Sequence, residues 1–364
     1  MIERLVGVEE EFLLVDVSGT TLRASDALIA TAVKASARTS GTVEHEFKRE
    51  QVETSTPPCA NLEQLTKELR GIRAQLAGTV LAEDIRIAAI GTSPLAVAPT
   101  TTPGVRYQAM EDRYEALARE QLSCGCHVHV TIENRAEAVG VIDRIRPWLA
   151  VIAALSANSP FWQGDDTGYA SYRSMVWGRW PSAGPTQAFG DVETYDRAIS
   201  ELVKCGGLLD PGMVYFDARV SANFPTVEIR VADVCQRVED AVLLAALCRA
   251  LVQTCAREWH EGRAAPDCRV ELLRLAGWRA ARFGMSSNLV HVPTVAPVPS
   301  WGLVDLLLEY IATSLEEFGD TDLVNRHLDR IREFGTGADL QRDSFTRTGR
   351  LADVVLDASA VTLA

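Results

Sequence analysis

Residues 7–12 read Gly-Val-Glu-Glu-Glu-Phe, and this short stretch predicts a strand with one strongly acidic face. A strand turns successive side chains to opposite sides of its sheet, so Glu9 and Glu11 share one face. Two carboxylates placed so close together repel each other unless a cation lies between them. The stretch alone leaves two interpretations open, a metal-binding face and an ordinary solvated face. Glu10 points the other way and is interpreted as structural or exposed.

Two further segments carry the same alternation. Residues 124–130 read Cys-Gly-Cys-His-Val-His-Val, so His127 and His129 share one face of a strand whose other residues are small or β-branched. Burying polar side chains without a partner is costly, and a metal ion or a phosphate is a partner that suits two histidines on one face. Glu53, two residues after Gln51, gives a weaker signal, because a surface glutamate explains it better when it is taken alone.

A predicted hairpin adds arginines to this pattern. Glu228 and Arg230 share a face of one strand, and Asp217 and Arg219 lie on the strand before it. The guanidinium fork of arginine matches phosphate oxygens, so an arginine beside a metal-binding glutamate suits a nucleoside triphosphate. An ordinary cross-strand ion pair is the competing interpretation.

The strands are irregularly spaced along the chain. Six are expected, at residues 3–16, 43–54, 85–90, 125–132, 213–220 and 226–233. Helices are expected at residues 25–36, 61–82, 107–121, 134–157 and 191–204, and over most of the chain from about residue 238. Pro147 predicts a kink or break in its helix. Since strands and helices do not alternate and the last two strands form a hairpin, the pattern favours an α+β fold with a mainly antiparallel sheet over a doubly wound parallel one. No clean linker or internal repeat is evident, so residues 1–364 are interpreted as a single domain.

Composition excludes several classes of protein. The 364 residues carry a net charge of −13, which argues against a general nucleic-acid binder. No apolar run reaches the roughly 18 residues of a membrane span, and the N-terminus lacks a signal sequence, so a cytoplasmic protein is expected. In that compartment the eight cysteines are expected to be thiols rather than disulfides.

The glycine-rich phosphate-binding loops G-x-x-x-x-G-K-[ST] and G-x-G-x-x-G are missing, so any ATP site must be built from the sheet and its metals.

Taken together, the motifs resemble the glutamate–cysteine ligase type 2 family, the carboxylate–amine ligases. The resemblance extends over most of the chain and rests on residues 7–16, 51–57, 124–130, 157–164, 167–174, 179–181 and 226–233. It implies a fold similar to that of glutamine synthetase, in which a curved, mainly antiparallel sheet of about six strands cups the active site and helices pack outside. It also implies ATP and two or three Mg²⁺ or Mn²⁺ ions as cofactors.

The resemblance assigns roles to individual residues. The implied metal ligands are Glu9, Glu11, Glu53, His127 and Glu228. His129 would approach the nucleotide phosphates, and Arg219 and Arg230 would hold the transferred phosphoryl group. A looser set for substrate binding comprises Arg173 and Arg179 for a carboxylate or phosphate, and Trp162, Tyr169 and Tyr172 for the walls of the pocket. The base that takes the proton of the amine is not identified, and Asp165, Asp166 and Asp233 are the candidates considered.

The implied reaction joins a carboxylate to an amine in two steps. ATP phosphorylates the carboxylate, the γ-carboxylate if the substrate is glutamate, and an amine such as that of cysteine then displaces phosphate. Its partners are therefore small molecules, with no nucleic acid and no membrane, and a homo-oligomer formed through a sheet edge stays open. Three alternatives also stay open: the same chemistry on another amino acid or amine, a metal-dependent amide hydrolase, and an inactive binding protein.

Overall fold

A computed structural model of the chain, which describes residues 2–21, 26–36 and 41–364, has a mainly antiparallel sheet at its centre. The strands are ordered β2-β3-β1-β5-β9-β8, and β4 pairs with the last residues of β1. Their bounds are β1 (Val6–Val15), β2 (Thr42–His45), β3 (Gln51–Ser55), β4 (Arg86–Ala88), β5 (Gly125–Thr131), β8 (Ala218–Val220) and β9 (Thr226–Asp233). All pairings within this sheet are antiparallel. The predicted α+β fold is thus confirmed.

The prediction of one strand over residues 43–54 was wrong. The chain reverses within that run, and β2 folds back to pair with β3, which makes the sheet seven-stranded rather than six-stranded. Residues 46–50 contain no glycine, proline or asparagine, so no turn is predicted there from composition. The turn is held instead by the 100–102 segment: Arg49 N donates to Thr100 O at 2.9 Å, and Thr102 N donates to Phe47 O at 2.9 Å.

Helices and short elements complete the fold. The helices are α1 (Asp26–Ser36), α2 (Leu62–Val80), α3 (Val105–Tyr114), α4 (Ala116–Glu120), α5 (Arg135–Ile145), α6 (Leu149–Leu155), α7 (Tyr172–Trp177), α8 (Val192–Lys204), α9 (Val238–His260), α10 (Val270–Phe283), α11 (Ser300–Phe318), α12 (Thr321–Phe334), α13 (Gly337–Thr348) and α14 (Leu351–Thr362). Two small sheets pair β6 (Phe161–Trp162) with β7 (Asp165–Asp166) and β10 (Asn288–His291) with β11 (Ala296–Pro299). The predicted break at Pro147 is confirmed, since a 3₁₀ turn at Arg146–Trp148 separates α5 from α6. Residue 25 of the first predicted helix lies outside the described residues.

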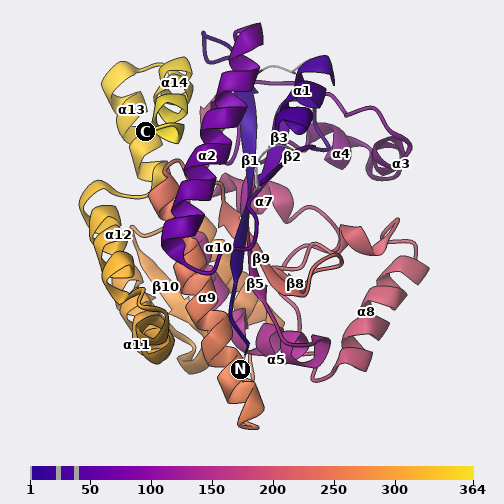
Figure 1. Ribbon diagram of the computed structural model, residues 1–364, viewed down its shortest axis with the longest axis vertical. Coiled ribbons are helices and arrows are strands. Elements are labelled where there is room, and N and C mark those ends of the chain that lie inside the picture. Colours follow the sequence, from indigo (N-terminus) through magenta and orange to yellow (C-terminus); the bar gives the residue numbers. More distant parts are fainter. Residues whose placement is uncertain (1, 22–25, 37–40) are drawn as a thin grey trace.

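The two faces of the sheet differ in chemistry. Helices α2 and α9 pack over one face, with α11 and α12 beyond them, whereas α3, α4 and α8 lie on the other side (Figure 1). Strand residues such as Val8, Val128 and Ile229 join the main hydrophobic core on the α2 and α9 side. The strand period then turns the ionisable residues of the sequence to the opposite face. One buried face therefore stabilises the sheet while the other is free to carry chemistry.

Glu10 is an exception to this division, because it lies on the apolar face. It forms a buried ion pair with Arg73 of α2, whose Nε donates to the glutamate at 2.9 Å. The Arg73 guanidinium also donates to the carbonyl oxygens of Cys235 and Gln236, both at 2.8 Å, and of Thr362 at 3.1 Å. This single side chain therefore joins α2, β1, the loop between β9 and α9, and the end of α14. Of the two interpretations of Glu10 given from the sequence, structural or exposed, this placement agrees with the structural one.

All eight cysteines are free thiols, and only Cys205 among them is exposed. Within the described ranges, no helix is both long enough and apolar enough to span a bilayer.

Candidate active site

The strand register brings the predicted acidic and histidine residues into adjoining rows. Glu9 of β1 lies directly opposite His127 of β5. One row further along β1, Glu11 lies opposite Glu53 of β3. Residues directly opposite each other on antiparallel strands have Cβ atoms about 5 Å apart. Four chemistry-bearing residues from three strands, far apart in the sequence, therefore converge on one patch.

A second row runs across β5, β9 and β8. His129 lies opposite Glu228, and Glu228 lies opposite Arg219. Between Cys126 and Val128 the pairing of β5 with β9 shifts by one residue, so two residues of β9, Arg230 and Val231, face one residue of β5. Such a β-bulge re-aims side chains and bends the strand.

Glu9 is the centre of the patch. Its Oε2 lies 3.3 Å from His127 Nδ1, and its Oε1 lies 3.1 Å from His129 Nε2. Burial acts to raise the pKa of Glu9, but the hydrogen bonds with His127 and His129 outweigh it and hold this pKa far below its usual range. Glu9 is therefore an anion that two imidazoles approach from neighbouring positions of one strand.

Two sets of three residues have the spacing of a metal site. Glu9, Glu53 and His127 form one set, and Glu9, His129 and Glu228 form the other, with the potential ligand atoms of each set within 4.8 Å of one another. Nε2 of His127 is buried and has no hydrogen-bond partner among the described residues, and Nε2 of His129 is buried beside the Glu9 carboxylate. Mostly oxygen ligands with one nitrogen suit Mg²⁺ or Mn²⁺, and the nitrogen favours Mn²⁺. The residues thus fit two divalent ions that share Glu9.

Glu11 and His129 are placed differently from the roles that the family resemblance implied. Gly125 N donates to Glu11 Oε2 at 2.6 Å, so one oxygen of this carboxylate is already bound by the backbone, and Glu11 belongs to neither set. His129 belongs to the second set, and its other ring nitrogen, Nδ1, lies 2.9 Å from Thr226 Oγ1. A partner on the second nitrogen fixes the orientation of a ligating imidazole.

Glu46 is a site residue that the sequence reasoning missed. It lies in the turn between β2 and β3 and lines the same cavity as Glu9, Glu11 and Glu53. Loss of hydration and the nearby charge of Glu11 raise the pKa of Glu46 to about 7. Loss of hydration also raises the pKa of Glu53 well above its usual value, and the charges of Glu46, Glu9 and Glu11 add to the effect. The carboxylates repel one another in a way that cations would relieve.

Divalent ions should therefore stabilise the fold measurably. A ligand present at about 100 times its dissociation constant stabilises a protein by about 2.7 kcal/mol. We expect MnCl₂ or MgCl₂ to raise the melting temperature in differential scanning fluorimetry, relative to NaCl at the same ionic strength. A melting temperature that millimolar divalent ions left unchanged would contradict the assignment of the two sets.

Arg219 and Arg230 flank the carboxylate of Glu228. Arg219 binds it in a bidentate manner, with Nε at 2.7 Å and Nη2 at 3.1 Å, and Nη1 of Arg230 also donates to it. Burial acts to raise the pKa of Glu228, but the two guanidinium groups lower it to about 2. Nε of Arg230 has no hydrogen-bond partner, and its guanidinium lies 5.6 Å from the ring of Trp177. Two cations thus border the second metal set.

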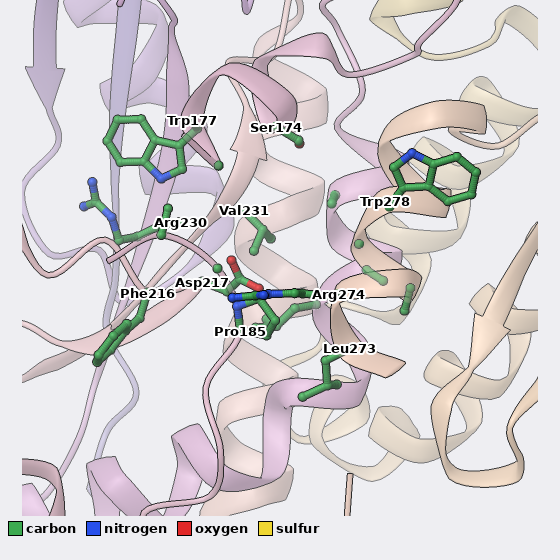
Figure 2. Close-up of a pocket in the computed structure, with 18 of the residues that line it drawn as sticks. Ser174, Trp177, Pro185, Phe216, Asp217, Arg230, Val231, Leu273, Arg274 and Trp278 are labelled. Carbon is green, nitrogen blue, oxygen red and sulfur yellow. The ribbon is translucent and has the colours of Figure 1, made fainter. Parts of the chain in front are cut away.

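Two cavities meet at this point. The first, which we call the acidic cavity, has a volume of about 250 Å³ and contains the first metal set. The second, of about 410 Å³, we call the arginine cavity, because its charged lining residues are Arg146, Arg173, Arg230 and Arg274 together with Asp217. Arg230 and Trp177 line both cavities. Figure 2 shows the arginine cavity, with Trp177 and Arg230 on one side and Trp278 on the other.

Arg173, predicted to bind a carboxylate or a phosphate, lines the arginine cavity. It lies on α7, is only 2% exposed, and its Nε has no hydrogen-bond partner. A Cβ atom at Gly125 would lie 2.2 Å from Arg173 Nη2, so glycine is what allows the guanidinium to pass so close to β5. A buried guanidinium without a bound carboxylate on the wall of a cavity is prepared to bind an anion.

Other predicted substrate residues lie outside both cavities. Arg179 is exposed and pairs with Glu120 at 2.8 Å. Trp162, Tyr169 and Tyr172 pack on one another, with ring centroids 5.9 Å apart for Trp162 and Tyr172 and 5.8 Å apart for Tyr169 and Tyr172. Their link to the arginine cavity is indirect, because Trp278 donates to the Tyr169 hydroxyl at 3.2 Å.

The three candidate bases are likewise remote or occupied. Asp165 and Asp166 lie on the exposed strand β7, and Asp166 pairs with Arg342 at 2.7 Å. Asp233 is buried and accepts hydrogen bonds from the backbone of Asn158 at 2.8 Å and the hydroxyl of Ser159 at 2.7 Å. A carboxylate held in this way anchors the loop before α7 rather than facing a substrate.

Comparisons with known proteins agree with this geometry. A model of glutamate-cysteine ligase family 2 matches residues 5–357. A Frankia alni protein provisionally named glutamate–cysteine ligase 2-2 is 47% identical, over 97% of this chain and 95% of its own. A Streptomyces avermitilis protein provisionally named glutamate–cysteine ligase 2-1 is also 47% identical, over 97% of this chain and 98% of its own.

Solved structures show the same fold at much lower identity. Glutamate–cysteine ligase from Francisella tularensis, solved with AMP, superposes with a TM-score of 0.71 at 14% identity, over 100% of this chain and 89% of its own. A bifunctional glutathione synthetase from Pasteurella multocida gives a TM-score of 0.72 at 16% identity, over 99% of this chain and 52% of its own. With its acidic sheet face, its flanking arginines and this sequence match, the chain belongs to glutamate-cysteine ligase family 2.

Proposed function

We propose that the protein is an ATP-dependent ligase that phosphorylates the γ-carboxylate of glutamate, or a closely similar carboxylate, and transfers the acyl group to an amine. The observation that carries this proposal is the position of Glu9, which two ligand sets share, beside the paired guanidinium groups of Arg219 and Arg230. An amide hydrolase would need a metal-activated water but no pair of cations for a phosphoryl group.

The sheet face would hold the ions and the nucleotide. Glu9, Glu53 and His127 would bind one divalent ion, and Glu9, His129 and Glu228 a second. Bound there, Mg²⁺ or Mn²⁺ would neutralise phosphate oxygens of ATP and so reduce their repulsion of an incoming carboxylate. Glu11 and Glu46 lie close enough to add negative charge around these ions.

The arginines would stabilise charge as it moves. Phosphoryl transfer depends on cations already aimed at the oxygens that gain charge. Arg230 keeps an unpartnered Nε next to both cavities, and Arg219 reinforces it from β8. Arg173, buried in the wall of the arginine cavity, would bind a carboxylate of the substrate. The roles of Arg179 and of the Trp162, Tyr169 and Tyr172 group stay predictions.

Cysteine is the amine that the names of the relatives suggest. These relatives are provisionally named glutamate–cysteine ligases, so cysteine is the first amine to test with this chain. A different amino acid or amine would use the same acyl phosphate, because the first step does not involve the amine.

The test is ADP release from ATP and Mg²⁺ with L-glutamate held constant and a panel of amines varied, with the products identified by mass spectrometry. We expect release that depends on cysteine and a product with the mass of γ-glutamylcysteine. Release with another amine alone would keep the chemistry and change the substrate. Amide cleavage without ATP, or ATP binding with no turnover across a broad panel of carboxylates and amines, would overturn the proposal.

A further inference from the structure

The proposed reaction needs a group that takes a proton from the amine, and the arginine cavity contains one carboxylate. Asp217 directly precedes β8 and lies across from Arg230, whose backbone N donates to Asp217 O at 2.9 Å. Within the described part of the chain, its carboxylate accepts no hydrogen bond. Figure 2 shows this carboxylate beside Arg274, while the Arg230 guanidinium points away from it.

Among the described residues that line the arginine cavity, Asp217 is also the only one that can act as a base. The other ionisable side chains are Arg146, Arg173, Arg230 and Arg274. Guanidinium groups keep their protons at all physiological pH values. The Arg146 guanidinium is moreover bound to backbone carbonyl oxygens, at 2.9 Å for Asp143 and 3.0 Å for Pro266.

The surroundings suit a base that works near neutral pH. Loss of hydration raises the pKa of Asp217 to about 7, and the charge of Arg274 only partly offsets this effect. A general base works best when its pKa lies near the operating pH. The other charged groups that line the cavity, among the described residues, are Arg146 before α6, Arg173 of α7, Arg230 of β9 and Arg274 of α10. All are arginines, so the protonation state of the cavity between pH 6 and 8 depends on Asp217.

We propose that Asp217 binds the ammonium group of the incoming amine and accepts the proton that makes it a nucleophile. This assignment rests on the proposed ligase function and adds the residue that serves its second step. Asp217 lines the arginine cavity, and this cavity shares Arg230 and Trp177 with the acidic cavity, so an amine bound at Asp217 can approach an acyl phosphate formed at the shared boundary.

The step balances without any further reactant. The ammonium gives one proton to the Asp217 carboxylate, and the lone pair of the neutral amine then forms the C–N bond with the acyl carbon. The bond between that carbon and the phosphate oxygen breaks, and phosphate takes the electron pair. The second proton passes from the nitrogen to the departing phosphate, which leaves as HPO₄²⁻.

Hydroxylamine separates this role from a structural one. At neutral pH hydroxylamine is mostly uncharged, so it attacks an acyl phosphate without needing a base. We expect Asp217→Asn to lower kcat/KM for the amino-acid amine by about 100-fold or more, while the formation of glutamyl hydroxamate stays at the wild-type rate. Retained hydroxamate formation also shows that the variant is folded and completes the first step.

Two comparisons sharpen the test. Asp196→Asn, a change at an exposed aspartate that pairs with Arg135 outside both cavities, should leave both reactions unchanged. The ratio of wild-type to Asp217→Asn kcat/KM for the amine should fall as the pH drops through about 7, because the carboxylate is then protonated and ceases to act as a base.

Three results would overturn the assignment. If Asp217→Asn lowered amine ligation and hydroxamate formation equally, Asp217 would serve the first step or the fold. If it lowered neither, Asp217 would be only the partner of Arg274. If the wild-type enzyme formed no hydroxamate with any carboxylate, the ligase function itself would fail, and the role of Asp217 would fail with it.

Discussion

Glu9→Gln is expected to reduce ADP release by more than about 100-fold, because Glu9 belongs to both ligand sets. Mutating a residue that only supports a metal ligand already lowers metal affinity or activity by up to about 100-fold. A glutamine side chain keeps the size but loses the charge, so both proposed ions lose a ligand at once. The measurement is kcat for ADP release in saturating ATP, together with the number of Mn²⁺ ions bound per chain.

The matched control is Glu44→Gln. Glu44 lies opposite Glu53 in the pairing of β2 with β3, but it is exposed on the sheet edge. This variant should keep wild-type activity and the full Mn²⁺ stoichiometry. If Glu9→Gln bound as much Mn²⁺ as the wild type and turned over at a similar rate, the proposal of two ions sharing Glu9 would be wrong.

Arg73→Met is expected to destabilise the fold by about 3–5 kcal/mol, the usual cost of leaving one partner of a buried ion pair uncompensated. The variant leaves the Glu10 carboxylate and the three carbonyl oxygens of Cys235, Gln236 and Thr362 without their donor. Chemical denaturation followed by circular dichroism measures the loss.

Arg70 provides the comparison on the same helix. It pairs with Glu239, but its side chain is 57% exposed. Arg70→Met should cost no more than about 1 kcal/mol, since exposed ion pairs contribute little. If the two arginine variants had the same free energy of unfolding, the buried bonds of Arg73 would not stabilise the fold by the expected amount. A double variant, Arg73→Met with Glu10→Leu, should recover part of the loss because no unpaired charge remains.

The alternation of residues was enough to predict the centre of the site. Whether Glu9 shares a face with Glu11, or His127 with His129, depends only on the two-residue period of a strand, which is a local property of the sequence. Which strands lie next to each other is not local. The pairing of β1 with both β3 and β5, which places Glu53 and His127 on either side of Glu9's strand, comes from the structure.

Glu46 and Asp217 show what the sequence could not supply. Glu46 was overlooked because its segment was interpreted as the middle of one strand, where it would have been one more alternating residue. The turn that points it into the acidic cavity depends on bonds to residues 100–102, which no short-range pattern predicts. Asp217 receives no role of its own from the sequence pattern, because its place beside Arg274 in a cavity is a property of the folded chain.

Arg179 was predicted together with Arg173, but the structure places the two arginines differently. Both are basic residues in the predicted substrate loop, but the six-residue helix α7 includes Arg173 and ends before Arg179. Arg173 lies near the start of this helix and is buried, whereas Arg179 follows its end and pairs with Glu120 at the surface. The position of a side chain relative to a short helix decided which arginine reaches the cavity.

The wide spacing of the ligand strands along the chain sets the order in which the protein can assemble on the ribosome. β1, β3 and β5 emerge early, but Glu228 arrives only when β9 has been synthesised, and β8 has β9 as its only partner in the sheet. Pairings between such distant segments form slowly. The affinity for Mn²⁺ should therefore appear late and abruptly during refolding, when the β8–β9 hairpin docks on β5. Binding of Mn²⁺ then reports the last step of folding.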